Sequence, residues 1–163
     1  MTRHENKPSF VYVTYIAAAP EEVWRALTDG TLTRQYWYGR RVDSSWKVGA
    51  TVTFWYETAE GEAISDRGIV LESRAPTRLS YTFHVQFVDE LRDEHPSRVT
   101  FDIAAEGKSS RLTLTHDEFD PGSKVLEGCR SGWPAILSSL KSLLETGKPL
   151  ALASPEGAGE AAA

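Results

Sequence analysis

The strongest constraint on this sequence is a long amphipathic segment near its C-terminus. Between Val125 and Leu144, apolar residues recur every three or four positions, the spacing that lines one face of an α-helix. Ser123 is a suitable N-cap, and Gly147 followed by Pro149 is a typical stop signal. The pattern predicts a helix of roughly 36 Å, whose apolar stripe needs a partner surface. The stripe consists of Val125, Leu126, Cys129, Trp133, Ile136, Leu137, Leu140, Leu143 and Leu144.

Upstream of this helix, the chain carries the residue types and alternation of β-strands. Six segments follow the pattern, at residues 10–16, 51–57, 63–72, 78–88, 98–104 and 111–116. Short turn signals, such as Glu106-Gly-Lys-Ser, separate the last five. Short connections make neighbouring strands antiparallel, because a parallel pair needs a crossover of about a dozen residues. The polar segment 89–96 is expected to be an exposed, mobile loop.

Two short helices are expected between the first strand and the rest of the sheet. Pro20 suits a first helical turn, where its missing N–H costs no hydrogen bond, and a second helix is expected at 31–37, capped by Asp29 or Thr31. A sheet with one apolar face needs a cover, and only the C-terminal helix is long enough to provide it. We therefore predict a two-layer α+β domain at 9–150, with flexible tails at 1–8 and 151–163.

Composition narrows the classes of function. Of the 163 residues, 40% are hydrophobic and 25% are charged, as in an ordinary globular protein. The net charge is −5 and basic residues are scattered, which argues against nucleic-acid binding; pairs such as Arg40–Arg41 are expected on the solvated surface. The polar N-terminus indicates no signal peptide, and no apolar run is long enough to span a bilayer. The single cysteine, Cys129, excludes an internal disulfide and favours the cytoplasm.

Few residues carry a chemical signature. His116 shares a strand face with Leu112 and Leu114, so it is expected to point toward the helix, where a neutral imidazole can donate to a ligand or act as a general base. The alternative is a histidine satisfied by a backbone or water partner. Cys129 lies on the apolar stripe and is expected to pack in the core. No metal spacing, nucleophile elbow, phosphate loop or dinucleotide fingerprint occurs, so no metal or cofactor is expected.

Three motifs in order point to a known family. They are Ile16-Ala-Ala-Ala-Pro-Glu-Glu-Val-Trp, Thr113-Leu-Thr-His-Asp and Gly132-Trp-Pro-Ala-Ile-Leu-Ser-Ser-Leu-Lys-Ser-Leu-Leu-Glu. With the order of elements, they resemble the SRPBCC (START-like, Bet v 1-like) superfamily, and within it the branch named after the activator of Hsp90 ATPase, the AHSA1-like proteins. The resemblance covers about residues 9–150 and implies a helix-grip fold, in which a curved antiparallel sheet wraps around the C-terminal helix.

The resemblance also implies a hydrophobic cavity between sheet and helix. Candidate ligand-binding residues follow from the aromatic inventory, the strand alternation and the analogy with this fold. They are Trp37, Phe54, Tyr56, Tyr81, Phe83, His116, Trp133 and Leu137. Their other interpretation is that they simply fill the core.

Several functions stay open at this point, because fold alone does not decide function. The leading hypothesis is binding of a hydrophobic small molecule or lipid in the cavity, in a stress-related role. The first alternative is an accessory protein of an Hsp90-type chaperone, as the branch name suggests. The second is a cyclase-like or hydrolase-like enzyme that uses His116. A sheet edge or a helix flank also offers a surface for a homodimer.

Overall fold

The computed structural model describes residues 7–152, which form an antiparallel sheet and four helices. The helices are α1 (Pro20–Thr28), α2 (Gly30–Tyr36), α3 (Asp89–Arg92) and α4 (Lys124–Thr146). The strands are β1 (Phe10–Ile16), β2 (Arg41–Asp43), β3 (Thr51–Thr58), β4 (Gly61–Arg74), β5 (Arg78–Val85), β6 (Ser97–Glu106) and β7 (Ser109–Asp117).

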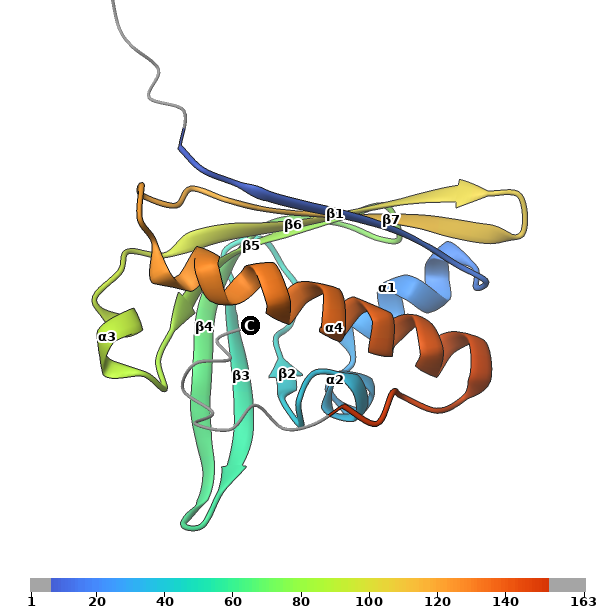
Figure 1. Ribbon diagram of the computed structural model, residues 1–163. Helices are drawn as coiled ribbons and strands as arrows, with labels where there is room; N and C mark the ends of the chain where they lie inside the picture. The colour runs from blue at the N-terminus through green and yellow to red at the C-terminus, as the bar shows by residue number, and fades with distance from the viewer. Residues whose placement is uncertain (1–6, 153–163) are drawn as a thin grey trace, which may run out of the picture.

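The seven strands form one curved sheet in the order β1-β7-β6-β5-β4-β3-β2, and every neighbouring pair is antiparallel. The sheet bends around α4, which runs along its concave side, while α1 and α2 close one end (Figure 1). This arrangement confirms the predicted α+β helix-grip fold. It also joins the N-terminal strand to the last one, since β1 pairs with β7 over its whole length.

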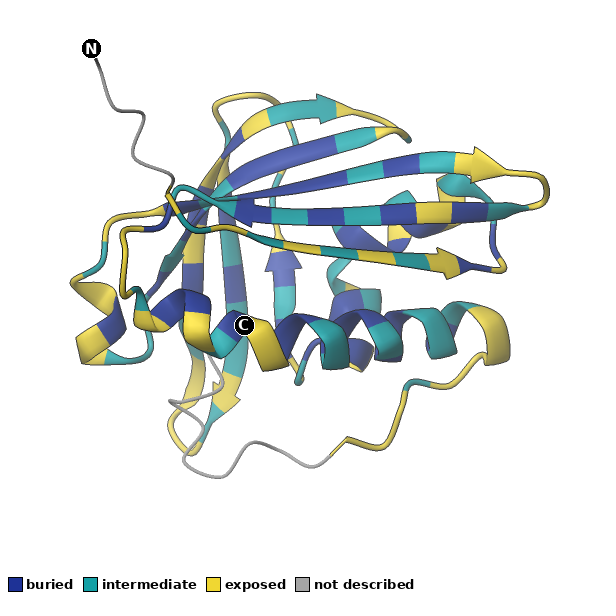
Figure 2. Ribbon diagram, turned by 45° about the horizontal axis from the view of Figure 1, so that its top comes forward, coloured by how far each residue is buried: buried dark blue, intermediate teal, exposed yellow. Residues whose placement is uncertain are grey.

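Helix α4 begins and ends where the sequence predicted. The Ser123 side chain accepts a hydrogen bond from the Leu126 N–H, and Gly147 ends the helix in the left-handed conformation with φ 82°. Of the nine residues of the predicted stripe, eight are buried and Leu144 is half-buried. The buried side of α4 faces the sheet and its exposed residues face outward (Figure 2). The helix therefore covers the hollow of the sheet with its apolar face.

Two elements were not predicted from the sequence. Strand β2 has only three residues and pairs with β3 at the second edge of the sheet. The segment 89–96, predicted to be an exposed mobile loop, instead contains the one-turn helix α3, with Leu91 buried. The predicted flexible tails, 1–8 and 151–163, lie outside the described residues except for positions 7, 8, 151 and 152.

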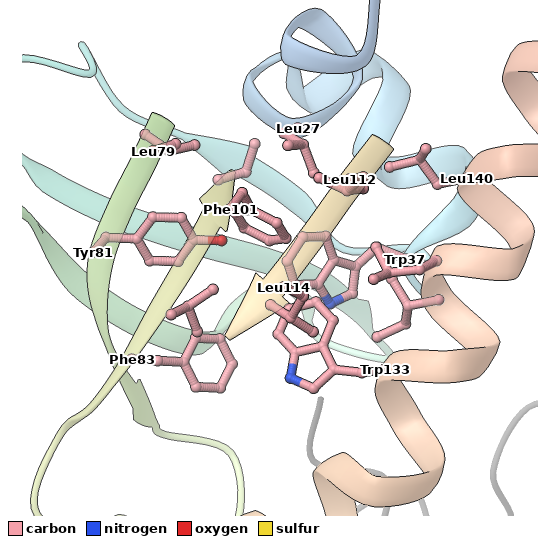
Figure 3. Packing of buried hydrophobic residues seen from close by; sticks show 14 of the residues in the cluster. Leu27, Trp37, Leu79, Tyr81, Phe83, Phe101, Leu112, Leu114, Trp133 and Leu140 are labelled. Carbon is pink, nitrogen blue, oxygen red and sulfur yellow. The ribbon is translucent and has the colours of Figure 1, made fainter. Parts of the chain in front are cut away.

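Aromatic rings occupy the space between the sheet and the middle of α4. Trp37, at the end of α2, lies 4.9 Å from Phe54 and 5.1 Å from Trp133, measured between ring centroids. The Trp133 ring in turn lies 5.9 Å from that of Phe101. Figure 3 shows Trp37, Phe101 and Trp133 gathered between the strands and the helix. At these separations the rings are in contact, so this part of the hollow is packed by the protein's own side chains.

Candidate functional site

The structure brings the predicted ligand-binding residues together in the interior. Seven of the eight are buried, with exposed fractions of 2% or less: Trp37, Phe54, Tyr81, Phe83, His116, Trp133 and Leu137. The eighth, Tyr56, is half-buried and packs its ring 5.9 Å from that of Phe87. The strand alternation thus pointed these side chains inward, where they pack mainly against one another.

His116 is held by hydrogen bonds on both of its ring nitrogens. Its Nδ1 accepts from the Trp133 indole N–H at 3.0 Å, so the ring proton is on Nε2, which lies 2.6 Å from Ser97 Oγ. The Ser97 hydroxyl donates onward to the Phe83 carbonyl. Burial lowers the pKa of His116 to about 3, because the charged imidazolium would be cut off from water. The neutral ring therefore links β7, β6 and α4.

The neighbouring thiol is part of the same cluster. Cys129 Sγ lies 3.5 Å from His116 Nδ1 and is fully buried. Burial raises the pKa of this thiol far above its ordinary range, so it stays protonated. Neither His116 nor Cys129 has a free reactive atom facing a solvent-accessible space, and a substrate would have to displace one of the existing partners to reach the imidazole.

A cleft lies between α3 and the first turns of α4, on the exposed side of that helix. Its volume is about 640 Å³, within the usual range of small-molecule sites. One wall comes from α3 and the residue before it, the other from the first two turns of α4. The cleft is lined by Val88, Glu90, Leu91, Lys124, Glu127, Gly128 and Ser131. Apolar surface from Val88 and Leu91 thus lies beside a charged rim.

A carboxylate fixes the two walls of the cleft to each other. Glu94, just after α3, accepts hydrogen bonds from the Lys124 and Val125 backbone N–H groups and from the Ser123 hydroxyl, at 2.9, 3.3 and 2.5 Å. The first N–H groups of a helix lack intrahelical partners and attract negative charge. Glu94 therefore caps α4 from the opposite wall and determines how far α3 stands from it.

Arg40 lies inside the protein, so its predicted place on the solvated surface is wrong. Only 6% of the residue is exposed. Its Nε donates to Ser65 Oγ at 3.2 Å and lies 3.6 Å from Asp66 Oδ2, and its guanidinium lies over the Phe87 ring at 4.9 Å. Arg41, by contrast, is at the surface and pairs with Glu62. A cation–π contact of this kind is typical of a partly desolvated arginine.

Two local irregularities of the backbone bring this group inward. Tyr38 and Gly39 both have positive φ, 47° and 74°, and turn the chain after α2 so that Arg40 enters the interior. A β-bulge in β4 breaks the pairing with β3, since Phe54 faces Asp66 while Trp55 faces Ile64. Ser65 is the extra residue, and both Ser65 and Asp66 become buried. Bulges commonly redirect side chains near functional sites.

Asp66 is a buried carboxyl with an incomplete set of partners. The Ser65 hydroxyl donates to its Oδ2 at 2.7 Å, but Oδ1 has no hydrogen-bond partner within residues 7–152. Burial raises the pKa of Asp66 to about 6, an effect that Arg40 opposes only in part. A buried carboxylate oxygen without a donor is costly, which marks this pair as a place where a further polar group would be stabilised.

The cleft and the burial of the Arg40–Asp66 pair were not predicted from the sequence. One wall of the cleft is α3, and the polar composition of 89–96 gave no sign of a helix there. The burial of Asp66 depends on the bulge in β4. Within residues 7–152, no three His, Cys, Asp or Glu side chains gather closely enough to hold a metal ion. In the same range, no helix combines the length and hydropathy needed to cross a bilayer.

A protein-family model matches most of this chain. The model described as "Activator of Hsp90 ATPase homolog 1-like protein" matches residues 17–145, which include most of the sheet and nearly all of α4. A search of the curated proteins found no match.

Solved structures with the same fold are numerous. The protein MLL2253 from Mesorhizobium loti has 24% sequence identity and a TM-score of 0.70, and the match covers 85% of this chain and 97% of that one. An HSP90 activator from Plasmodium falciparum has 23% identity and a TM-score of 0.66, with coverage of 83% and 95%. The Aha1 dimer from Colwellia psychrerythraea has 18% identity and a TM-score of 0.68, with coverage of 86% and 98%. At these identities the likeness concerns the fold.

Proposed function

This chain belongs to the activator of Hsp90 ATPase homolog 1-like family, and we propose that it binds a hydrophobic small molecule or lipid. The observation that supports this most directly is the cleft of about 640 Å³ between α3 and the start of α4. Val88 and Leu91 give it an apolar wall, and Lys124, Glu90 and Glu127 give it polar groups at the rim. A site of this size, with an apolar wall and a charged rim, suits a ligand that has an apolar body and a polar end.

The packing of the interior supports a ligand site in the cleft between α3 and α4 rather than beneath the middle of α4. There, Trp37, Phe54 and Trp133 are in ring contact and fully buried. A ligand under the middle of the helix would have to push these rings apart, and displacing closely packed side chains costs several kcal/mol. The cleft needs no such rearrangement, because its volume is already present.

The hydrogen bonds and the low pKa of His116 favour binding over catalysis as the function of this protein. A general base needs a free lone pair within reach of a substrate. Nδ1 of His116 is occupied by the Trp133 N–H and its Nε2 by Ser97. The pKa of about 3 also makes it a weak base. We therefore assign His116 to the support of α4 and the ligand to the cleft.

Titration of ¹⁵N-labelled protein with 1-decanol, a neutral apolar probe, tests the proposed function. The backbone amide signals of Val88, Leu91, Gly128 and Ser131 are expected to shift together and to saturate. Ser131→Trp places a large side chain in the cleft and should abolish the shifts of the other three. Arg130→Trp is the matched control, because Arg130 is an exposed neighbour on α4 that does not line the cleft. Absence of saturable shifts in these residues would refute the proposal.

A second candidate function is interaction with an Hsp90-type chaperone. The family description and the likeness to an HSP90 activator from Plasmodium falciparum support it. On this chain, the edge strand β1 has exposed apolar side chains at Val11, Val13 and Tyr15, with exposed fractions of 57%, 48% and 55%. Such an edge is suited to a protein partner.

The chaperone hypothesis is tested by adding the purified protein to an Hsp90-type ATPase. Stimulation of ATP hydrolysis that Val13→Glu removes, while the cleft variant Ser131→Trp retains it, would support this second function. No stimulation and no complex in sedimentation would count against it. Sedimentation of the protein alone, in the same experiment, reports whether the β1 edge pairs with a second copy.

A further inference from the structure

The cleft between α3 and α4 has an excess of negative charge. Its lining includes two carboxylates, Glu90 on α3 and Glu127 on α4, but a single ammonium group, that of Lys124. The other lining residues are uncharged. The chain as a whole has a net charge of −5, so it does not compensate for this local excess. A cleft lined mainly by one sign of charge raises the local concentration of ligands of the opposite sign.

The ammonium group is already paired with one of the two carboxylates. Lys124 Nζ lies 3.5 Å from Glu90 Oε2, and this contact joins the α4 wall of the cleft to the α3 wall. Both side chains are largely exposed, and an exposed ion pair of this kind contributes little free energy. Lys124 therefore balances the charge of Glu90 and can be separated from it at low cost.

Glu127 is the carboxylate of the cleft that keeps an unbalanced charge. Within residues 7–152, its side chain has no cation at ion-pair distance and no hydrogen-bond partner, whereas Glu90 has Lys124. Glu94, behind the cleft, is occupied by the Ser123 hydroxyl and by two backbone N–H groups of α4. Glu127 therefore has both carboxylate oxygens available to a ligand that enters the cleft.

We propose that the ligand of the cleft is an amphipathic amine, an alkylammonium whose hydrocarbon chain lies against Val88 and Leu91 and whose charged end pairs with Glu127. This inference rests on the proposed function and specifies its ligand class. A primary amine is protonated at pH 7, as a lysine side chain is, and its N–H groups form charge-assisted hydrogen bonds with a carboxylate. An alkyl carboxylate would instead be repelled by the excess negative charge, and a neutral alcohol would gain from the apolar wall alone.

Titration calorimetry with three ligands of equal chain length, decylammonium, 1-decanol and decanoate, tests the inference at pH 7 and low ionic strength. The wild-type protein should bind decylammonium about three- to fivefold more tightly than 1-decanol, the range expected for a partly exposed ion pair. Decanoate should bind more weakly than 1-decanol. Added salt should reduce the differences between the three ligands, because it screens exposed charges.

Two variants should change the preference for decylammonium in opposite directions. Glu127→Gln leaves one carboxylate and one ammonium group in the cleft, so decylammonium should bind no better than 1-decanol. Lys124→Gln frees Glu90, so the preference should exceed that of wild type. The double variant again has one carboxylate in excess and should recover the wild-type preference. Glu21→Gln, which changes an exposed acid on α1 that does not line the cleft, is the matched control and should have no effect.

The affinity for 1-decanol should stay the same in all of these variants, because none of them changes the apolar wall. Equal binding of the three ligands by the wild-type protein would overturn this inference and leave the proposed function standing. A preference for decylammonium that both Glu127→Gln and Lys124→Gln leave unchanged would have the same consequence. If none of the three ligands binds the wild-type protein, the proposed function fails together with the inference.

Discussion

At the level of single side chains, the interior contains two polar clusters that differ in how far their hydrogen bonds are satisfied. In the first, His116 has a partner on each ring nitrogen and connects Trp133 to Ser97. In the second, the described part of the chain offers no donor to Asp66 Oδ1, while Arg40 donates through its Nε to Ser65 Oγ. Satisfied buried clusters stabilise a fold, whereas incomplete ones commonly mark ligand sites.

His116 should make the protein sensitive to acid. In the unfolded chain its pKa is close to 6.5, and burial lowers it to about 3. Below pH 6.5 the unfolded state therefore binds a proton that the folded state does not, so stability falls as the pH falls toward 3. His116→Gln retains a donor and an acceptor without titrating. The advantage of wild type over this variant in free energy of unfolding should shrink by roughly 2 kcal/mol between pH 6.5 and pH 5, measured by urea denaturation; a constant difference would contradict the account.

Asp66 should give the opposite dependence of stability on pH. Its pKa is raised from 3.8 to about 6 in the folded state, so the folded state binds the proton more tightly and stability is lost as the pH rises through this interval. Asp66→Asn keeps the shape and cannot ionise. Relative to wild type, it should gain roughly 2 kcal/mol in free energy of unfolding between pH 4 and pH 7. The exposed change Asp89→Asn serves as control. An Asp66→Asn variant that gains nothing over this range would show that the buried carboxyl is not strained.

The burial of Arg40 is a feature of a single side chain that could not be predicted from the sequence. Arg40 stands next to Arg41 in a polar stretch of sequence, and such stretches are typical of a solvated surface. Its inward direction follows from the left-handed turn at Tyr38 and Gly39, and the bulge at Ser65 buries its partners Ser65 and Asp66. A bulge adds one residue to one strand, so alternation alone assigns the wrong face beyond it. His116, within the regular part of β7, was placed on the correct face because no such irregularity precedes it.

At the scale of elements, the position of α4 determines the site. Its apolar stripe covers the sheet, and its N-terminus is capped by Ser123 and Glu94. Near its C-terminal end, Lys141 donates to the Tyr15 carbonyl and Glu145 accepts from the Ala17 N–H, which satisfies the edge of β1 at that point. The helix is thus fixed at both ends, while the cleft lies beside its first turns.

Removal of the Glu94 carboxylate should loosen the cleft as well as the fold. Glu94→Ala leaves two N–H groups of α4 without an acceptor, so it should lower the free energy of unfolding by about 1–2 kcal/mol, the usual cost of a lost cap. Because Glu94 also connects α3 to α4, ligand affinity at the cleft should fall more than stability alone explains. Thermal unfolding and the 1-decanol titration measure the two effects. Asp89→Ala changes the first residue of α3, which pairs with Arg92 at the surface, and should change neither.

Element length explains which parts of the architecture could be predicted. Helix α4 extends over 23 residues, so its period is repeated many times and its ends carry clear signals. Strand β2, with three residues, and α3, with four, are too short to show any period. Since α3 forms one wall of the cleft, the site itself could not be predicted, although the fold around it could.

At the scale of the whole molecule, the sheet and α4 enclose a core that aromatic rings pack in its middle. The cleft lies at its margin, where α3, which follows β5, meets the start of α4. The helix-grip architecture was predicted from the order of elements and the three motifs. The position of the open space within it was not, because it depends on how large rings pack between distant strands.

The most direct test of the proposed function is a crystal structure of the protein with 1-decanol. The proposed function predicts density for the apolar chain between α3 and α4, in contact with Val88 and Leu91. The rings of Trp37 and Trp133 should stay in contact. Density beneath the middle of α4 with these rings displaced, or a protein without bound ligand at saturating 1-decanol, would contradict it.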